Sequence, residues 1–238
     1  MIRCSPMSNH GISTLNRGSE LPAACQERPN SIGSESLAAN PRSTIRNPRS
    51  QLIVLSGPGG TGKTTVARRL LERKNLPLEI SVSATTRKPR PGEVDGVHYH
   101  FLSREEFDRR RQRGEFVECA EVFGNFYGTL RSELESRLSR GRSVLLEIDV
   151  QGAMEIKRQF PEAVLIFLKT PSMDEYERRL RLRATDDEQA IRRRLEGARQ
   201  ELARADAYDY EVVNDQLDQA VRDIEAIFCE AGGNHSAG

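Results

Sequence analysis

The sequence lacks the features that would assign it to several whole classes of protein. No apolar run approaches the roughly 18 residues that a membrane-spanning helix needs, and no continuous apolar segment near the N-terminus is typical of a secretory signal. The four cysteines, at positions 4, 25, 119 and 229, show no C-x-x-C spacing, which disfavours a zinc site and a disulfide framework. We therefore expect a cytoplasmic protein with free thiols.

An excess of either charge is also missing. Lys and Arg total 36 against 35 for Asp and Glu, and the net charge of +1 gives no general reason to expect binding to nucleic acid or membranes. Any basic function must therefore be local. With 238 residues, of which 37% are hydrophobic, the chain can form a soluble globular protein of one large or two small domains.

Periodic apolar residues are almost absent from residues 1–49, which mix Ser, Asn, Pro and Arg. This composition cannot bury enough apolar surface to offset chain entropy, so we expect a disordered extension there and a disordered tail over residues 230–238. An organelle transit peptide is a weaker alternative, because Glu20, Glu27 and Glu35 are unusual in an acid-poor leader. A misplaced start codon is a further alternative.

The stretch Gly57–Thr64 fits the phosphate-loop pattern G-x-x-x-x-G-K-S/T without a gap, shortly after the apolar run Leu52–Leu55. The two segments predict a strand buried on both faces, a phosphate-binding loop and a helix that begins near Lys63. The glycines let backbone N–H groups turn towards an anion at the positive end of the helix dipole. Lys63 would reach the outer phosphates, and the Thr64 hydroxyl would ligate magnesium. The alternative is a glycine-rich turn with an incidental lysine.

Short apolar or alternating segments recur along the rest of the chain and predict further strands. They are Ile80–Ser83, Tyr99–Leu102, Phe116–Val122, Val144–Ile148, Ala163–Leu168 and Tyr210–Val213. Helical patterns separate most of them, and this alternation favours a parallel α/β sheet with right-handed crossovers. A ligand would lie at the carboxyl ends of its strands. Residues from about 84 to 140 indicate an inserted α+β lobe.

Capping-box patterns predict where three helices begin, at Ser103–Glu106, Ser172–Glu175 and Thr185–Glu188. The last two helices flank a short break at residues 183–185, and in both an acid stands four residues before an arginine, as Glu175 does before Arg179. We therefore expect a solvated, salt-bridged helix pair. The glycines of Gly124–Thr129 predict a turn before the next helix.

A second group of candidate phosphate ligands follows the second predicted strand. Arg87 and Arg90 stand three residues apart on a proline-stiffened loop, and Tyr99 follows. Arginine grips phosphate through two parallel hydrogen bonds, so a second phosphate site is one interpretation and an exposed basic loop is an equal one. His98 and His100 share a strand face, but no third ligand is near in sequence and we expect no metal there.

Five segments, in order and spacing, resemble the guanylate kinase family. The resemblance covers about residues 50–229, and its most specific elements are T-T-R-x-P-R-x-G-E and G-N-x-Y-G-T. It implies a P-loop NTPase-type parallel sheet core with an inserted GMP-binding lobe and a helical lid over about residues 178–200. The segments are Gly57–Thr65, Ser81–Gly96, Glu118–Thr129, Leu146–Gly152 and Val212–Asp215.

The activity that the resemblance implies is ATP:GMP phosphotransfer, with Mg²⁺ as cofactor, ATP as co-substrate and dGMP as a second acceptor. The implied partners are these nucleotides alone, and no binding to nucleic acid or a membrane is expected. The implied oligomeric state is a monomer or a small homo-oligomer. The implied ATP-binding residues are Gly57, Pro58, Gly59, Gly60, Thr61, Gly62, Lys63, Thr64, Thr65 and Asn214.

The resemblance also implies how GMP is held. Ser83 and Thr129 would donate to guanine O6, while Glu118 would accept hydrogen bonds from N1–H and the 2-amino group. AMP has an acceptor at N1 and no 2-amino group, so it would leave Glu118 unpaired. The residues that would hold the GMP phosphate are Arg87, Arg90, Tyr99 and Tyr127.

The lid arginines implied by the resemblance are Arg179, Arg183 and Arg194, which would act with Lys63 on the transferring phosphoryl group. A structural ion pair is the alternative for each arginine. Asp149 would lie near magnesium and GMP, or alternatively would only cap the next helix. Glu147 stands where the family often has Asp, so its role is open. No general base is required, because a phosphate monoester is already largely a dianion at neutral pH.

Two other functions fit part of the pattern. One is a non-catalytic interaction module resembling the guanylate-kinase-like domains of scaffold proteins, which the intact phosphate loop disfavours. The other is a kinase for a different nucleotide, which would not depend on Glu118.

Overall fold

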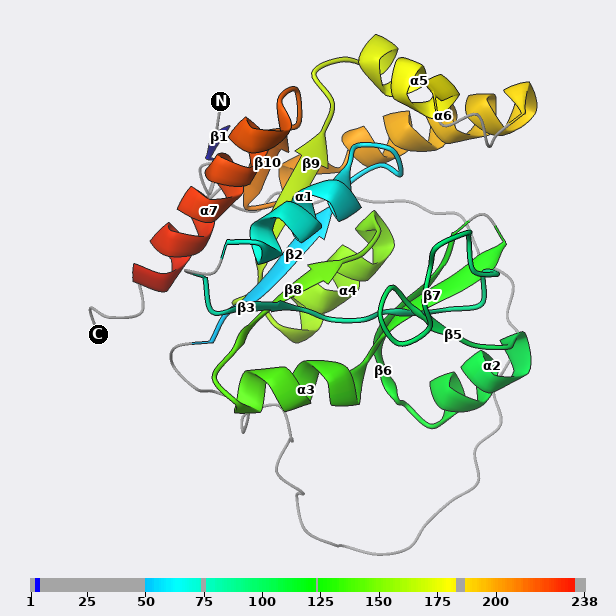
Figure 1. Ribbon diagram of the computed structural model, residues 1–238, viewed down its shortest axis with the longest axis vertical. Helices are drawn as coiled ribbons and strands as arrows, with labels where there is room; N and C mark the ends of the chain where they lie inside the picture. Colours follow the sequence, from blue (N-terminus) through cyan, green and yellow to red (C-terminus); the bar gives the residue numbers. More distant parts are fainter. Residues whose placement is uncertain (1–2, 5–49, 74–75, 123, 183–186, 234–238) are drawn as a thin grey trace, which may run out of the picture. The chain divides into compact units, whose positions relative to one another are not determined.

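The core sheet is built from the short apolar segments that the sequence marks as buried strands (Figure 1). The computed structural model describes residues 3–4, 50–73, 76–122, 124–182 and 187–233, all within one compact unit. The strands pair in parallel except at the first edge. In spatial order they are β1 (Arg3–Cys4), β10 (Tyr210–Val213), β9 (Val164–Lys169), β2 (Leu52–Ser56), β8 (Ser143–Glu147) and β3 (Leu78–Ile80).

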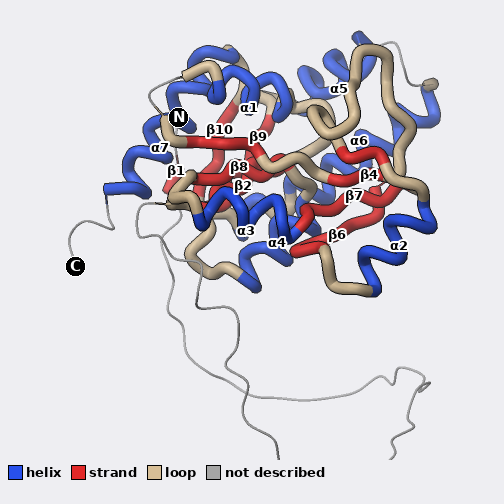
Figure 2. The backbone as a smooth tube through the Cα atoms, turned by 60° about the horizontal axis from the view of Figure 1, so that its bottom comes forward, coloured by secondary structure: helices blue, strands red, loops and turns tan. Residues whose placement is uncertain are grey.

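Strand β2 shows why this sheet needs cover on both faces. Leu52 and Val54 belong to one apolar cluster, and Ile53 and Leu55 belong to the other, because successive side chains of a strand point to opposite faces. Helices α1 (Lys63–Leu71) and α7 (Leu217–Gly233) cover the second cluster, whereas α3 (Arg131–Ser139) and α4 (Val150–Gln159) cover the first (Figure 2). The continuous apolar runs of the sequence therefore predict the core correctly.

A second, smaller sheet carries mixed pairing in the order β5-β4-β7-β6. Its apolar face is closed by α2 (Arg104–Gln112), whose fully buried Phe107 stacks on Phe116 at 4.4 Å and on Phe126 at 5.5 Å between ring centroids. The pairing is parallel only between β4 and β5. The strands are β4 (Ala84–Thr85), β5 (His100–Phe101), β6 (Phe116–Val122) and β7 (Asn125–Leu130).

A helix pair, α5 (Met173–Leu182) and α6 (Glu188–Leu202), follows β9 and packs through buried Tyr176, Leu180 and Ala198. A short 3₁₀ turn, Ala205–Ala207, then leads to β10. The expected ion pairs of these helices are present, with Glu175 to Arg179 at 2.6 Å.

The predicted turn at Gly124–Thr129 is wrong. Residues Asn125–Leu130 form β7, which pairs with β6 on one side and with β4 on the other. Local glycine and asparagine content favours a turn, but pairing on both edges stabilises an extended backbone instead. The second strand is also misplaced, because β3 covers Leu78–Ile80 and the smaller sheet already begins at Ala84.

Two of the three capping predictions are confirmed. The Ser103 hydroxyl accepts from Glu106 N and the Ser172 hydroxyl accepts from Glu175 N, each at 3.1 Å. The third is wrong, because Asp187 caps α6 by accepting from Ala190 N at 2.7 Å. Asp187 and Thr185 are two residues apart, and both are good capping types, so the sequence leaves the choice open.

Both ends of the chain contain more structure than expected. Arg3–Cys4 forms β1 against Tyr210 and Glu211, so the expected disorder of residues 1–49 does not hold at these two positions. The remainder of that segment lies outside the described residues. Helix α7 continues to Gly233, four residues into the expected tail. Cys119 and Cys229 are free thiols. Within the described ranges, no helix is long and apolar enough to span a membrane.

Candidate active site

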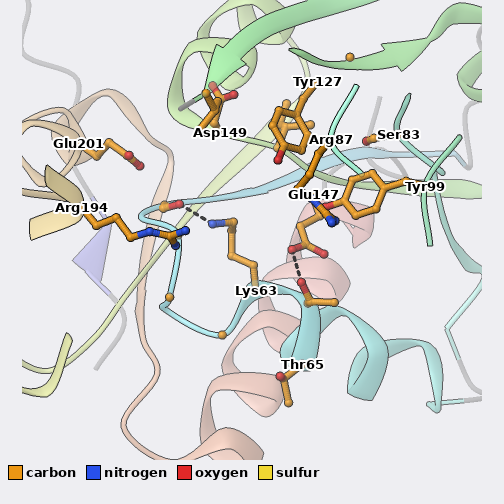
Figure 3. Close-up of a pocket in the computed structure, with 18 of the residues that line it drawn as sticks. Lys63, Thr65, Ser83, Arg87, Tyr99, Tyr127, Glu147, Asp149, Arg194 and Glu201 are labelled. Carbon is orange, nitrogen blue, oxygen red and sulfur yellow. Dashed lines mark hydrogen bonds between the residues drawn. The ribbon is translucent and has the colours of Figure 1, made fainter. Parts of the chain in front are cut away.

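A cavity of about 230 Å³ lies at the carboxyl ends of β2 and β8 (Figure 3). The sequence predicts a ligand at this place, at the carboxyl ends of parallel strands and beside the helix that follows β2. The predicted site residues that line the cavity are Gly57, Gly59, Gly60, Gly62, Lys63, Thr64, Thr65, Ser83, Arg87, Arg90, Tyr99, Glu118, Tyr127, Asp149 and Arg194.

The phosphate loop needs its glycines for both conformation and space. Gly57, Gly60 and Gly62 have φ values of 131°, 135° and 95°, in the region that other residues rarely adopt. A Cβ atom at Gly57 would lie 2.2 Å from the carbonyl oxygen of Leu168 on β9. The loop therefore lies directly against the sheet, and α1 begins at its end with its positive dipole end at the cavity.

Lys63 lies across the loop in the centre of the cavity (Figure 3). Its ammonium group donates to the carbonyl oxygens of Gly57 at 2.5 Å and Pro58 at 3.2 Å. Beside it, the Thr64 hydroxyl donates to Glu147 Oε1 at 2.5 Å, which joins the start of α1 to the end of β8. The Lys63 ammonium group is thus held at the loop by two carbonyl oxygens.

The Arg87 side chain is held in a fixed orientation rather than exposed on a basic loop. Its guanidinium makes two hydrogen bonds of 2.9 Å to Glu93, and its side chain is only 15% exposed. The guanidinium also lies 5.3 Å from the centroid of the Tyr99 ring, and Tyr99 contacts Tyr127 edge-on at 6.1 Å. Burial raises the pKa of Tyr99 to about 12, so its hydroxyl stays protonated and can donate.

Glu118 is a buried carboxylate at the cavity wall, 5% exposed. The Thr129 hydroxyl donates to its Oε1 at 2.7 Å, and a Cβ atom at Gly152 would lie 2.6 Å from its Oε2. Burial raises the pKa of Glu118 to about 7, and the nearby Asp149 carboxylate acts in the same direction. A perturbed carboxylate in a cavity is a candidate ligand-binding group.

Asp149 caps the next helix and also lines the cavity. Its Oδ1 accepts from Gln151 N at 2.7 Å and from Gly152 N at 3.0 Å, so it caps α4. It also lines the cavity, together with Glu118 and with Glu147 at the end of β8. The cap fixes the side chain at the cavity without removing it from the site.

Several predicted residues lie behind the cavity instead of in it. Thr129 is fully buried against Glu118. The Thr61 hydroxyl donates to the carbonyl of Pro58, so both belong to the frame of the loop. Asn214 Nδ2 donates to the carbonyl oxygen of Thr61 at 2.7 Å, which places its amide beneath the loop.

The three lid arginines do not share one environment. Arg194 on α6 lines the cavity. Arg179 on α5 donates to Glu175 at 2.6 Å and to the carbonyl oxygen of Asn214 at 2.8 Å, which is the ion-pair alternative. Arg183 lies outside the described residues. Arg194 is therefore the described member of the three that lines the cavity.

Four residues that sequence reasoning did not assign also line the cavity, and Glu147 joins them as the partner of Thr64. Glu201 could have been found from the sequence, because it follows Arg194 by seven residues on a helix and so lies on the same face. Burial raises the pKa of Glu201, and the Lys63 ammonium opposes that shift. The unassigned residues are Val122, Gly128, Ile148 and Glu201.

The cavity shows no self-sufficient metal centre. Among the described residues, no group of three or more His, Cys, Asp or Glu side chains could hold an ion. The Thr64 and Glu147 oxygens are hard ligands of the kind that Mg²⁺ accepts when phosphates and water complete its shell. The donor set of Thr64 and Glu147 therefore fits a nucleotide-bound Mg²⁺. His98, which is not among the lining residues of the cavity, accepts a hydrogen bond from Val94 N at Nδ1, at 3.0 Å.

Comparisons with known proteins agree with this geometry. A family model described as guanylate kinase matches residues 49–231. The chain is 50% identical over 176 residues to the guanylate kinase of Fusobacterium nucleatum, which covers 74% of this chain and 94% of that protein. It is 49% identical over 192 residues to the guanylate kinase of Gloeobacter violaceus, covering 81% and 93%. The crystal structure of guanylate kinase from Anaplasma phagocytophilum is similar with a TM-score of 0.65 and 41% identity, covering 76% of this chain and 85% of that chain.

Proposed function

The chain belongs to the guanylate kinase family, and we propose that its cavity is where the γ-phosphoryl group of ATP is transferred to GMP. The chain is an ATP:GMP phosphotransferase that converts ATP and GMP to ADP and GDP. The observation that carries the site assignment is one cavity lined by the phosphate loop, by Arg87 and by Glu118. An anion cradle, a second cationic group and a buried carboxylate are what ATP and a guanine nucleotide together require.

ATP would bind at the loop end of the cavity. Phosphate oxygens would accept from the loop amides, and Lys63 would exchange its two carbonyl acceptors for them. That exchange is favourable because a hydrogen bond between two charged groups is stronger than one to a neutral carbonyl. Arg194 would neutralise charge that develops on the transferring phosphoryl group.

Mg²⁺ is the proposed ion for ATP. Thr64 and Glu147 would hold it or its water ligands with their two oxygen groups, which stand 2.5 Å apart. When bound, the ion would neutralise part of the charge on the phosphate oxygens.

GMP would bind at the opposite end. Its phosphate would contact Arg87, Arg90, Tyr99 and Tyr127, all of which line the cavity. Glu118 would accept from guanine N1–H and the 2-amino group, and Ser83 would donate to O6. Thr129 donates its only hydroxyl proton to Glu118, so we assign it to orient that carboxylate instead of contacting O6.

The proposed mechanism needs no general base. The phosphate of GMP is already largely a dianion near neutral pH and can attack directly. The protein would supply alignment of the two phosphates and neutralisation of their charge by Lys63 and Arg194. The remaining expectations stay predictions from the sequence: dGMP as a second acceptor, a monomer or small homo-oligomer, and the cytoplasm.

The test is a coupled ADP-release assay with ATP, Mg²⁺ and each of GMP, AMP, CMP and UMP in parallel. Turnover selective for GMP is the expected result. Comparable turnover of another monophosphate would favour a kinase for that nucleotide. No turnover by folded protein would favour the non-catalytic interaction module.

A further inference from the structure

Hydrogen bonds hold most carbonyl oxygens of the phosphate loop in fixed directions. Gly57 O accepts from Lys63, and Pro58 O accepts from the Thr61 hydroxyl at 2.9 Å. Gly62 O accepts from Val66 N at 3.0 Å as the first bond of α1. These partners are within six residues of their acceptors, so the loop sequence supplies them by itself.

Two further carbonyls depend on residues far away in the sequence. Gly59 O accepts from the hydroxyl of Tyr176, 117 positions later on α5, at 2.9 Å. Thr61 O accepts from the amide of Asn214, 153 positions later, at 2.7 Å. Asn214 O in turn accepts from Arg179 at 2.8 Å, so α5 supports the loop at both points. Helix α5 is thus part of the frame of the phosphate loop.

Tyr176 also supports the loop by packing. Its side chain is 3% exposed, and a Cβ atom at Gly60 would lie 3.2 Å from its ring and 3.2 Å from Leu180. Gly60 therefore lies closely against α5, and its φ of 135° suits glycine. The hydroxyl and the ring of one tyrosine act on two successive loop residues.

The direction of one loop amide follows from this contact. In a planar trans peptide the carbonyl and the next N–H point in opposite directions, and no peptide bond of the described residues is cis. Holding the Gly59 carbonyl towards α5 therefore turns the Gly60 N–H away from α5. Gly59 and Gly60 both line the cavity, so an amide that points away from α5 can face a phosphate bound there.

We propose that Tyr176 is a positioning residue for phosphate binding, because its hydroxyl fixes the Gly59–Gly60 peptide with the amide directed at the ATP phosphates. This inference rests on the proposed function only in taking the loop as the ATP site. Without the hydroxyl the peptide can rotate about its flanking glycine bonds, and the amide must be ordered when the phosphates bind.

The variant Tyr176→Phe removes the hydroxyl and keeps the ring against Gly60. Calorimetric titration should show MgADP binding about fivefold weaker, the equivalent of one neutral hydrogen bond of about 1 kcal/mol. GMP binding in the same protein should not change, since its phosphate has other ligands. Tyr176→Leu keeps an apolar contact and lacks the hydroxyl, so it should show the same selective loss.

Tyr208→Phe is the matched control. Tyr208 is equally buried, 3% exposed, and its hydroxyl donates to the Ser56 side chain at 2.9 Å, not to a loop carbonyl. It should lose a similar amount of stability in urea unfolding and bind MgADP normally.

Unchanged MgADP affinity in both Tyr176 variants would overturn the proposal, as would an equal loss for GMP, which a general loss of folding produces. Direct binding separates this test from the reaction itself. Wild-type protein that binds MgADP but does not phosphorylate GMP would refute the proposed function and leave Tyr176 testable. Wild-type protein that does not bind MgADP would refute both.

Discussion

The two ends of the cavity present different groups to the two proposed nucleotides. At the loop end the proposed ligands are mainly backbone amides from one continuous stretch, Gly57–Thr64, aided by the dipole of α1. At the other end they are side chains from separate strands and loops, such as Arg87, Tyr127 and Glu118. Backbone amides do not titrate near neutral pH, whereas Glu118 does, because its pKa is raised to about 7.

The two ends differ in what they contribute to binding: the loop contributes affinity for phosphate, and the other end contributes selectivity for one nucleotide. A loop of amides recognises the shape and charge of any phosphate chain, and every ATP-like ligand offers the same atoms to it. A buried carboxylate held by Thr129 is satisfied only by a ligand with donors in the matching places. We therefore expect the second end to determine which monophosphate reacts. Its buried carboxylate, Glu118, destabilises the empty protein. Mutations at the two ends should consequently fail in different ways.

The largest expected effect is at the loop end. Lys63→Ala should lower kcat for GMP phosphorylation by at least about 10²-fold to 10³-fold, since one preorganised charged donor to the transition state is lost. The protein should remain folded, because the Lys63 bonds to Gly57 and Pro58 lie within the loop itself. Steady-state kinetics and circular dichroism check both statements. Retained activity would remove Lys63 from the mechanism.

At the other end, Glu118→Gln should lower kcat/KM for GMP by about 10²-fold while the KM for ATP stays nearly constant. The amide keeps an acceptor for Thr129 but presents one donor to guanine, which has donors there itself. Kinetics with GMP and ATP varied in turn measure the two constants. A loss shared equally by both substrates, or no loss for GMP, would contradict the division between the ends.

The smallest expected effect is a difference in the pH dependence of nucleotide affinity at the two ends. The raised pKa of Glu118 means that the carboxylate is protonated below about pH 7, and only the anion accepts both guanine donors. GMP affinity should therefore fall by up to about tenfold per pH unit as the pH drops below about 7, while MgADP affinity changes less. Calorimetry between about pH 5.5 and about pH 8 measures both.

Glu118→Gln is also the control for that profile, since the phosphate of GMP itself titrates near pH 6. Subtracting its profile leaves the part due to Glu118, and a wild-type profile identical to that of the variant would refute the assignment. The stability of the empty protein should change with pH in the opposite direction to GMP affinity. A carboxyl group whose pKa is raised on folding stabilises most at low pH, and this contribution is lost as the pH rises through about 7. The empty wild-type protein should therefore become less stable over that range, and the variant should not.

The sequence predicts the parts of the structure that local patterns determine, and it misses those that depend on contacts between distant segments. Strand β2 and the loop after it are correct because four apolar residues and a glycine pattern determine a buried strand and a turn locally. Strand β7 is missed because its glycines and asparagine favour a turn in isolation, and pairing with β6 and β4 overrides them. Arg87 is predicted as a ligand, but its two bonds to Glu93 appear only in the folded loop.

The sequence by itself determined the position of the phosphate loop and the order of the core strands along the chain, and its resemblance to the guanylate kinase family named most of the residues at the cavity. The loop and the strands depend on patterns within a few residues, which local backbone geometry translates directly into structure. Only the tertiary structure decided that Glu118 is buried, that Arg194 and not Arg179 lines the cavity, and that Tyr176 holds Gly59. Burial and bonds across 117 positions depend on how elements pack, and no local pattern contains that information.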